Sequence, residues 1–224
     1  VFDDRAATHH QTWDAARAAI RAARRVGVNP PVVVGVWNGS TSERPLQRGF
    51  ELAPQKVLSS GMPINPRVAG WFEMDRVEGD RYLSEVADQI VPTVKQIVGA
   101  DLPVAMMGAS MGGLATIYAL GERPDVFGSG LAFSVHWPFA GDPLVDGLID
   151  RLPAPGRVRL WMQNGTGGLD ASYAPFQRRA DARLIARGYR PGRDFVSRVL
   201  PRSGHNEWSW AKRLPDAISW WLKL

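Results

Sequence analysis

The strongest constraint on the fold of this chain is a unit that recurs along its second half: a short apolar strand, a loop and an amphipathic helix. The pattern predicts strands at residues 103–107, 129–135, 157–163 and 195–200, and helices at residues 112–120, 144–152, 172–187 and 206–222. Strands that alternate with helices favour a parallel sheet covered by helices on both faces. We therefore predict an α/β fold in a single domain that spans residues 1–224.

The first half of the chain carries the same pattern less regularly. Residues 12–26 are predicted to form a helix, and the apolar run at 31–36 is predicted to form a strand buried on both faces. A further helix is predicted at 82–98, with a kink at Pro92. Residues 38–78 are rich in Gly, Pro, Ser and Arg without a clear period, which is typical of a functional surface.

Composition argues against several classes of function. The 27 basic residues exceed the 22 acidic ones only modestly and form no long basic block, so nucleic acid is not an expected partner. The absence of cysteine removes disulfides, thiolate catalysis and thiolate metal sites. No apolar run approaches the roughly 18 residues of a membrane span. Localisation and oligomeric state are left open by these features.

The sequence Gly108-Ala109-Ser110-Met111-Gly112 stands between a predicted strand and a predicted helix. This is the context of a nucleophile elbow, in which small residues on both sides allow a sharp turn that lifts the serine hydroxyl clear of the sheet. Gly108 and Gly112 are expected to provide that room. The backbone N–H of Met111 is expected to face the carbonyl oxygen that becomes an oxyanion. The alternative is a purely structural turn.

A serine nucleophile needs a base, and the chain has four histidines: His9, His10, His136 and His205. His9 and His10 precede the first helix, and His136 follows the strand at 129–135. His205 lies in the loop after the last strand and just before the last helix, where a base would reach Ser110. We therefore predict His205 as the base, with an ordinary surface histidine as the alternative.

The third member of a triad is an acid that follows the serine and precedes the histidine in the chain. Asp170 meets this condition in a glycine-rich loop after the strand at 157–163. Its alternative role is to cap the helix that begins near Ser172. Asp142 and Asp146 are rivals because they follow the preceding strand, whereas Asp181 lies within a helix and is the weakest candidate.

These residues give the chain a resemblance to the putative esterase family, which includes esterase D, feruloyl and acetyl-xylan esterases, enterochelin esterases and mycolyltransferases. The matching stretches are residues 33–38, 48–51 with 54–55, the Ser110 elbow, residues 134–138, residues 165–170, and residues 204–207 with Trp210. The resemblance implies an α/β-hydrolase fold with Ser110, Asp170 and His205 as the triad.

The resemblance also implies strands upstream of Val1. In the family an Asp-Gly-Gln type segment at the end of such a strand helps to form the oxyanion hole. This sequence has no counterpart to it, so we expect an N-terminally incomplete α/β hydrolase, or a second oxyanion donor that comes from elsewhere.

The function expected from these features is hydrolysis of a small or carbohydrate-linked acyl ester through an acyl-enzyme, without a metal or other cofactor. His136 and Trp137 are expected to line the substrate pocket, with plain packing as the alternative, and Arg48 and Glu51 are expected to form a buried ion pair. Trp210 is interpreted as a packing residue. An acyltransferase of the same fold, or a noncatalytic or partner-completed module, are the alternatives.

Overall fold

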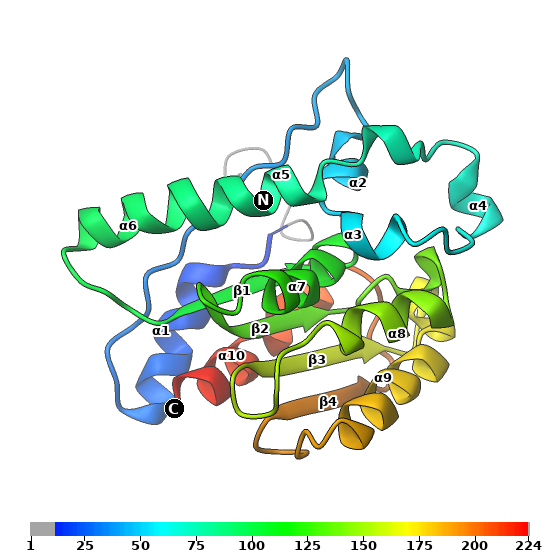
Figure 1. Cartoon of the computed structure of the whole chain (residues 1–224). Helices are drawn as coiled ribbons and strands as arrows, with labels where there is room; N and C mark the ends of the chain where they lie inside the picture. Colours follow the sequence, from blue (N-terminus) through cyan, green and yellow to red (C-terminus); the bar gives the residue numbers. More distant parts are fainter. Residues whose placement is uncertain (1–11, 224) are drawn as a thin grey trace.

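The computed structural model describes residues 12–223, so His9 and His10 lie outside the described residues. Four strands form one parallel sheet in the order β1-β2-β3-β4 (Figure 1). The strands are β1 (Val104–Ala109), β2 (Phe127–Phe133), β3 (Arg159–Gly165) and β4 (Phe195–Leu200). Because all four strands run parallel, their carboxyl ends lie along one edge of the sheet. The predicted alternation of strands and helices is confirmed.

Helices cover both faces of the sheet, as Figure 1 shows. The connections α7 (Met111–Glu122), α8 (Asp142–Asp150) and α9 (Ala174–Ala186) lie on one face, and α1 (Ala15–Val26) packs with α10 (Glu207–Leu222) on the other. Successive side chains of a strand point to opposite faces. On β2, Leu131 and Phe133 accordingly join the α1 and α10 cluster, while Ala132 joins the core on the other side.

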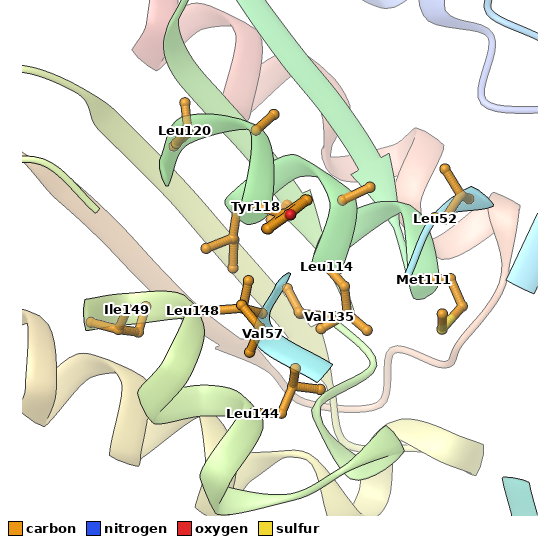
Figure 2. Close-up of a cluster of buried hydrophobic side chains, with 14 of the residues drawn as sticks. Leu52, Val57, Met111, Leu114, Tyr118, Leu120, Val135, Leu144, Leu148 and Ile149 are labelled. Carbon is orange, nitrogen blue, oxygen red and sulfur yellow. The ribbon is translucent and has the colours of Figure 1, made fainter. Parts of the chain in front are cut away.

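The larger of the two cores lies beneath α3 (Gln55–Leu58). Figure 2 shows Val57 of α3 between side chains of α7 and α8. Tyr118 of α7 extends this contact, since its hydroxyl accepts a hydrogen bond from the Lys56 backbone at 3.2 Å and donates one to Asp80. The apolar helix α7 is thus held between the sheet and the segment that precedes it.

The helix predicted at 82–98 is present as a continuous rod of three parts. α5 (Gly79–Glu85) passes into a π-helical turn, η2 (Val86–Ile90), and then into α6 (Val91–Val98). In the π turn the N–H of Val91 bonds to the carbonyl of Val86, five residues earlier. Pro92 follows directly and has no N–H to donate, so the wider turn before it is the local response to proline.

The prediction of a buried strand at 31–36 is wrong. The segment forms no strand, and the side chains of Val32, Val33 and Val34 are 52%, 38% and 46% exposed. An apolar run becomes a strand only when its backbone N–H and C=O groups pair with a neighbouring strand. Among the described residues the sheet ends at β1, and none of its strands pairs with this segment.

The segment predicted to be irregular, residues 38–78, contains short helices joined by turns. They are α2 (Gln47–Glu51), α3, α4 (Pro66–Ala69) and the 3-10 turn η1 (Met74–Arg76). α4 begins with a local signal: the Asn65 side chain accepts a hydrogen bond from the Arg67 N–H at 3.0 Å, and Pro66 occupies the first turn. The segment has local order although it lacks a long-range hydrophobic period.

Candidate active site

Ser110 occupies the turn between β1 and α7 with φ 58° and ψ −120°. A non-glycine residue with positive φ is uncommon, and such strain is often found at functional sites. Gly108 makes the turn possible: a Cβ at this position would lie 2.3 Å from the carbonyl oxygen of Gly112. Gly112 itself has open space, since nothing lies within 4 Å of a Cβ built there. The expectation that both glycines make room is therefore correct for Gly108 and wrong for Gly112.

Met111 is the first residue of α7, and its side chain and backbone serve different purposes. The side chain is buried in the large core, as Figure 2 shows, and anchors the start of the helix. The Ser110 carbonyl accepts hydrogen bonds from Gly113 and Leu114 in the first turn. Among the described residues no acceptor is bonded to the N–H of Met111, which leaves it free to bind an anion at the helix N-terminus.

Asp170 and His205 meet where the loops after β3 and β4 run side by side. The carbonyl of Ser203 accepts hydrogen bonds from Thr166 and Gly167 at 3.0 and 2.9 Å. A Cβ on Gly165 would lie 2.0 Å from the same carbonyl oxygen, so this close approach requires glycine. The result is a hydrogen bond of 2.7 Å between His205 Nδ1 and Asp170 Oδ1.

The carboxylate of Asp170 is fully buried and is an acceptor on both oxygens. Oδ2 accepts from the Ser134 hydroxyl and from the Gly165 N–H, each at 2.6 Å, while Oδ1 faces His205. Burial by itself would raise the pKa of Asp170, but the hydrogen bonds from His205, Ser134 and Gly165 outweigh it and lower the pKa below its ordinary value. Because an ionised carboxylate only accepts, Nδ1 of His205 donates the hydrogen bond, and in the neutral imidazole Nε2 then has the lone pair.

Two aromatic rings contact the imidazole of His205. Tyr173 and Trp210 both meet it edge-on, with ring centroids 5.6 and 5.1 Å away. Tyr173 also bonds to Nδ1 of His136 at 2.5 Å, and the backbone N–H of His136 donates to the Ser110 carbonyl at 3.2 Å. A chain of contacts thus links the elbow of Ser110 to the His205 loop.

The rival acids lie in other environments. Asp142 and Asp146 form ion pairs with Arg179 between α8 and α9, and Asp181 is within hydrogen-bond distance of Gln177 on its own helix. The Asp170 side chain does not cap α9, which has no side-chain cap. The assignment of Asp170 as the orienting acid stays a prediction, but it is the candidate that the fold brings to His205.

His136 and Trp137 differ in their access to the site. His136 is partly exposed, and burial, followed by electrostatic interactions with His205 and Arg48, lowers its pKa to about 4. Trp137 has no exposed surface, and its indole N–H donates to Gln177. Our expectation that Trp137 lines the pocket is therefore wrong: the strand β2 ends before it, and a 3-10 turn, η3 (Trp137–Phe139), carries its ring into the core.

Arg48 and Glu51 do not form the expected ion pair. Glu51 accepts from the Gly39 N–H at 2.8 Å, whereas Arg48 donates to the carbonyl of Ala109, the residue before Ser110, at 3.3 Å. Burial lowers the pKa of Arg48. The arginine therefore belongs to the surroundings of the elbow.

The sequence pattern did not predict two residues that contact Asp170 or His205, namely Ser134 and Tyr173. Both lie in loops after strands of the sheet, and Ser134 stands at the first position of the matching stretch 134–138. Trp210, predicted to be a packing residue, lies five residues after His205, and this spacing could have indicated a contact. Only the folded chain brings these three side chains to Asp170 and His205.

Among the described residues no group of three or more His, Asp and Glu side chains is arranged to hold a metal ion. No helix in the described part of the chain is both long and apolar enough to cross a membrane.

Residues 70–220, more than half of the chain, match the sequence family described as Putative esterase. The chain belongs to the putative esterase family. This confirms the resemblance that the elbow and the Gly204-His205 motif had indicated. A comparison with curated proteins gave no match for this family member.

Solved structures with the same fold include three proteins of low sequence identity. The enterobactin esterase FES from Shigella flexneri is 19% identical with a TM-score of 0.61, and the match covers 90% of this chain and 47% of that one. The siderophore hydrolase EstA from Aspergillus nidulans is 18% identical with a TM-score of 0.54, covering 92% and 78%. The BES protein from Bacillus cereus is 13% identical with a TM-score of 0.63, covering 92% and 77%. This member of the family thus spans about half the length of FES and has the expected α/β-hydrolase type of fold.

Proposed function

We propose that this chain is a serine carboxylic-ester hydrolase that works through an acyl-enzyme on Ser110. The observation that carries the proposal is the hydrogen bond of 2.7 Å between His205 and a buried, ionised Asp170, at the sheet edge where Ser110 stands in a strained turn. Membership of the putative esterase family supports the same reaction class.

The proposed reaction begins when His205 Nε2 accepts the proton of the Ser110 hydroxyl as its oxygen attacks the ester carbonyl. The Met111 N–H at the start of α7 stabilises the negative charge that forms on the carbonyl oxygen. His205 then returns the proton to the alcohol as it leaves. Asp170 holds the imidazole in the required tautomer and stabilises its positive charge throughout. A water molecule activated by His205 releases the acid in the second half of the cycle.

We further propose that the substrate is a small or carbohydrate-linked acyl ester. Two of the similar structures are an enterobactin esterase and a siderophore hydrolase, so enterobactin belongs in the substrate panel beside an acetylated sugar. The fold alone is shared at this level of identity, and the reaction is therefore tested first with simple esters.

The test is hydrolysis of p-nitrophenyl acetate and butyrate by the purified chain. Ser110→Ala should abolish turnover while the circular dichroism spectrum and the melting temperature stay close to those of the wild type, because only the nucleophile is lost. Ser42→Ala, a change on the exposed segment before α2, is the matched control and should retain full activity. Equal turnover by the Ser110→Ala and wild-type proteins would overturn the proposal.

A further inference from the structure

Ser134 lies just beyond the end of β2, is 1% exposed and has a positive φ of 43°. Its backbone N–H donates to the Gln163 carbonyl of β3 at 2.6 Å, which fixes the residue between the two strands. Serine has no intrinsic preference for this conformation. A strained and buried serine next to the acid of a proposed triad calls for an explanation beyond packing.

The direction of the hydrogen bonds around Ser134 follows from the chemistry of the groups. The indole N–H of Trp210 can only donate, and it donates to Ser134 Oγ at 2.9 Å. The hydroxyl proton of Ser134 is then directed to Asp170 Oδ2 at 2.6 Å. The network therefore runs from Trp210 through Ser134 to Asp170, and His205 donates to the other oxygen of the same carboxylate.

Trp210 interacts with both members of the Asp170–His205 pair. Its indole N–H acts on Asp170 through Ser134, and its ring packs edge-on against the imidazole of His205, with an interplanar angle of 79°. Asn206 caps the helix that carries Trp210 by accepting from Ser209, so the loop of His205 is tied to the first turn of that helix.

We propose that Ser134 and Trp210 are positioning residues that orient the Asp170–His205 pair for proton transfer. The inference rests on the proposed function, because it assigns these side chains a role in the same reaction. With Oδ2 held by Ser134 and Gly165, only Oδ1 is free to fix the imidazole. Loss of the Ser134 hydroxyl lets the carboxylate rotate and weakens the hold on His205, while the surface that binds substrate is unchanged.

The first test is steady-state hydrolysis of p-nitrophenyl butyrate by Ser134→Ala. A hydrogen bond to a charged group has a strength that corresponds to a loss of about 10-fold to 100-fold in kcat, with KM nearly unchanged. Ser134→Gly should lose as much, because glycine accepts the positive φ yet also lacks the hydroxyl. Ser129→Ala removes another buried serine of β2 and is the matched control, expected to keep full kcat.

The Trp210→Phe variant keeps an aromatic ring on the side chain and removes the N–H together with the rest of the five-membered ring. It should lower kcat by about 5-fold, the loss of one neutral hydrogen bond. Trp208→Phe, an exposed tryptophan on the same helix, should leave kcat unchanged. Because Trp208→Phe is the same replacement at a position outside the network, this pair tests the inference even where a Ser134 variant is unstable.

A double-mutant cycle separates positioning from a general structural role. If Ser134 acts through Asp170, Ser134→Ala should lower kcat by less than about twofold in an Asp170→Asn background, since the group it positions is already gone. Equal losses in both backgrounds, or a Ser134→Ala kcat equal to that of Ser129→Ala, would overturn the inference and leave the triad intact.

NMR spectroscopy tests the positioning role of Ser134 without a measurement of turnover. The proton on Nδ1 of His205 should give a protected downfield NMR signal in the wild type and in Ser129→Ala, and that signal should be shifted or lost in Ser134→Ala. An unchanged signal in Ser134→Ala would contradict the positioning role. Absence of turnover in the wild type would overturn the proposed function, and this inference with it.

Discussion

Replacement of Asp170 by asparagine changes one atom in a network whose donors are already fixed. Oδ2 accepts two hydrogen bonds and Oδ1 accepts one, so the single carbonyl oxygen of asparagine is better placed on the side of Ser134 and Gly165. Its amide group then faces Nδ1 of His205. Two donors cannot bond, and the imidazole must move its proton to Nε2, where it can no longer accept one from Ser110.

The expected result is a fall in kcat of about 10⁴-fold, the size seen where an asparagine imposes the wrong tautomer on a triad histidine. The loss of one charge-assisted hydrogen bond should cost about 1.5–3 kcal/mol of stability, or a drop of roughly 3–12 °C in melting temperature for a chain of this size. The protein therefore remains folded at the assay temperature, so the fall in kcat measures the effect of the substitution on the active site.

The assay is kcat for p-nitrophenyl butyrate at 25 °C beside calorimetric melting of the same samples. Asp181→Asn is the control, because Asp181 is a partly buried aspartate that contacts Gln177 and Ser197 of β4, and it should keep normal rates. Near-normal rates for Asp170→Asn together with a large loss for Asp142→Asn or Asp146→Asn would refute the reasoning and move the acid to the loop after β2.

The two remaining predictions concern the elbow and His136. Gly108→Ala places a Cβ against the backbone of Gly112 and should cost at least about 3 kcal/mol of stability and most of the activity. Gly112→Ala should keep or raise the melting temperature, because its Cβ meets open space within a helix. A lower melting temperature for Gly112→Ala than for Gly108→Ala would be incompatible with this geometry. His136 has a folded pKa of about 4 against an ordinary 6.5, so the unfolded chain binds the extra proton between these values and stability falls as the pH drops from 6.5 towards 4, by up to about 3 kcal/mol. Urea unfolding should show that His136→Gln flattens this dependence, and equal pH profiles for the two proteins would argue against the lowered pKa of His136.

The sequence predicted the parallel sheet because each strand after residue 100 is an apolar run bounded by breakers, and the helices between them have a clear period. It predicted Ser110, Asp170 and His205 because each follows a strand whose carboxyl end must reach the same edge. The prediction of a strand at 31–36 was wrong, because no neighbouring strand pairs with this apolar segment among the described residues. Composition shows that a segment can form a strand, but pairing depends on a neighbour that local pattern does not reveal.

The partners of the site could not be predicted in the same way. Ser134 and Asp170 are 36 residues apart, and Trp210 donates to Ser134 from 76 residues away. Such contacts depend on the positive φ of Ser134 and on the packing of α10 across the sheet, neither of which leaves a periodic signal. The prediction for Trp137 was wrong in the opposite way, because a residue that is close to a site in the sequence can have its side chain in the core.

The central claim is that Ser110 is a nucleophile activated by His205, and covalent labelling with a fluorophosphonate tests it most directly. Intact mass and peptide mapping should show one adduct, on Ser110, in the wild type and none in Ser110→Ala. His205→Ala should label far more slowly, because nothing then accepts the serine proton. An adduct on a different residue, or labelling of His205→Ala at the wild-type rate, would contradict the account.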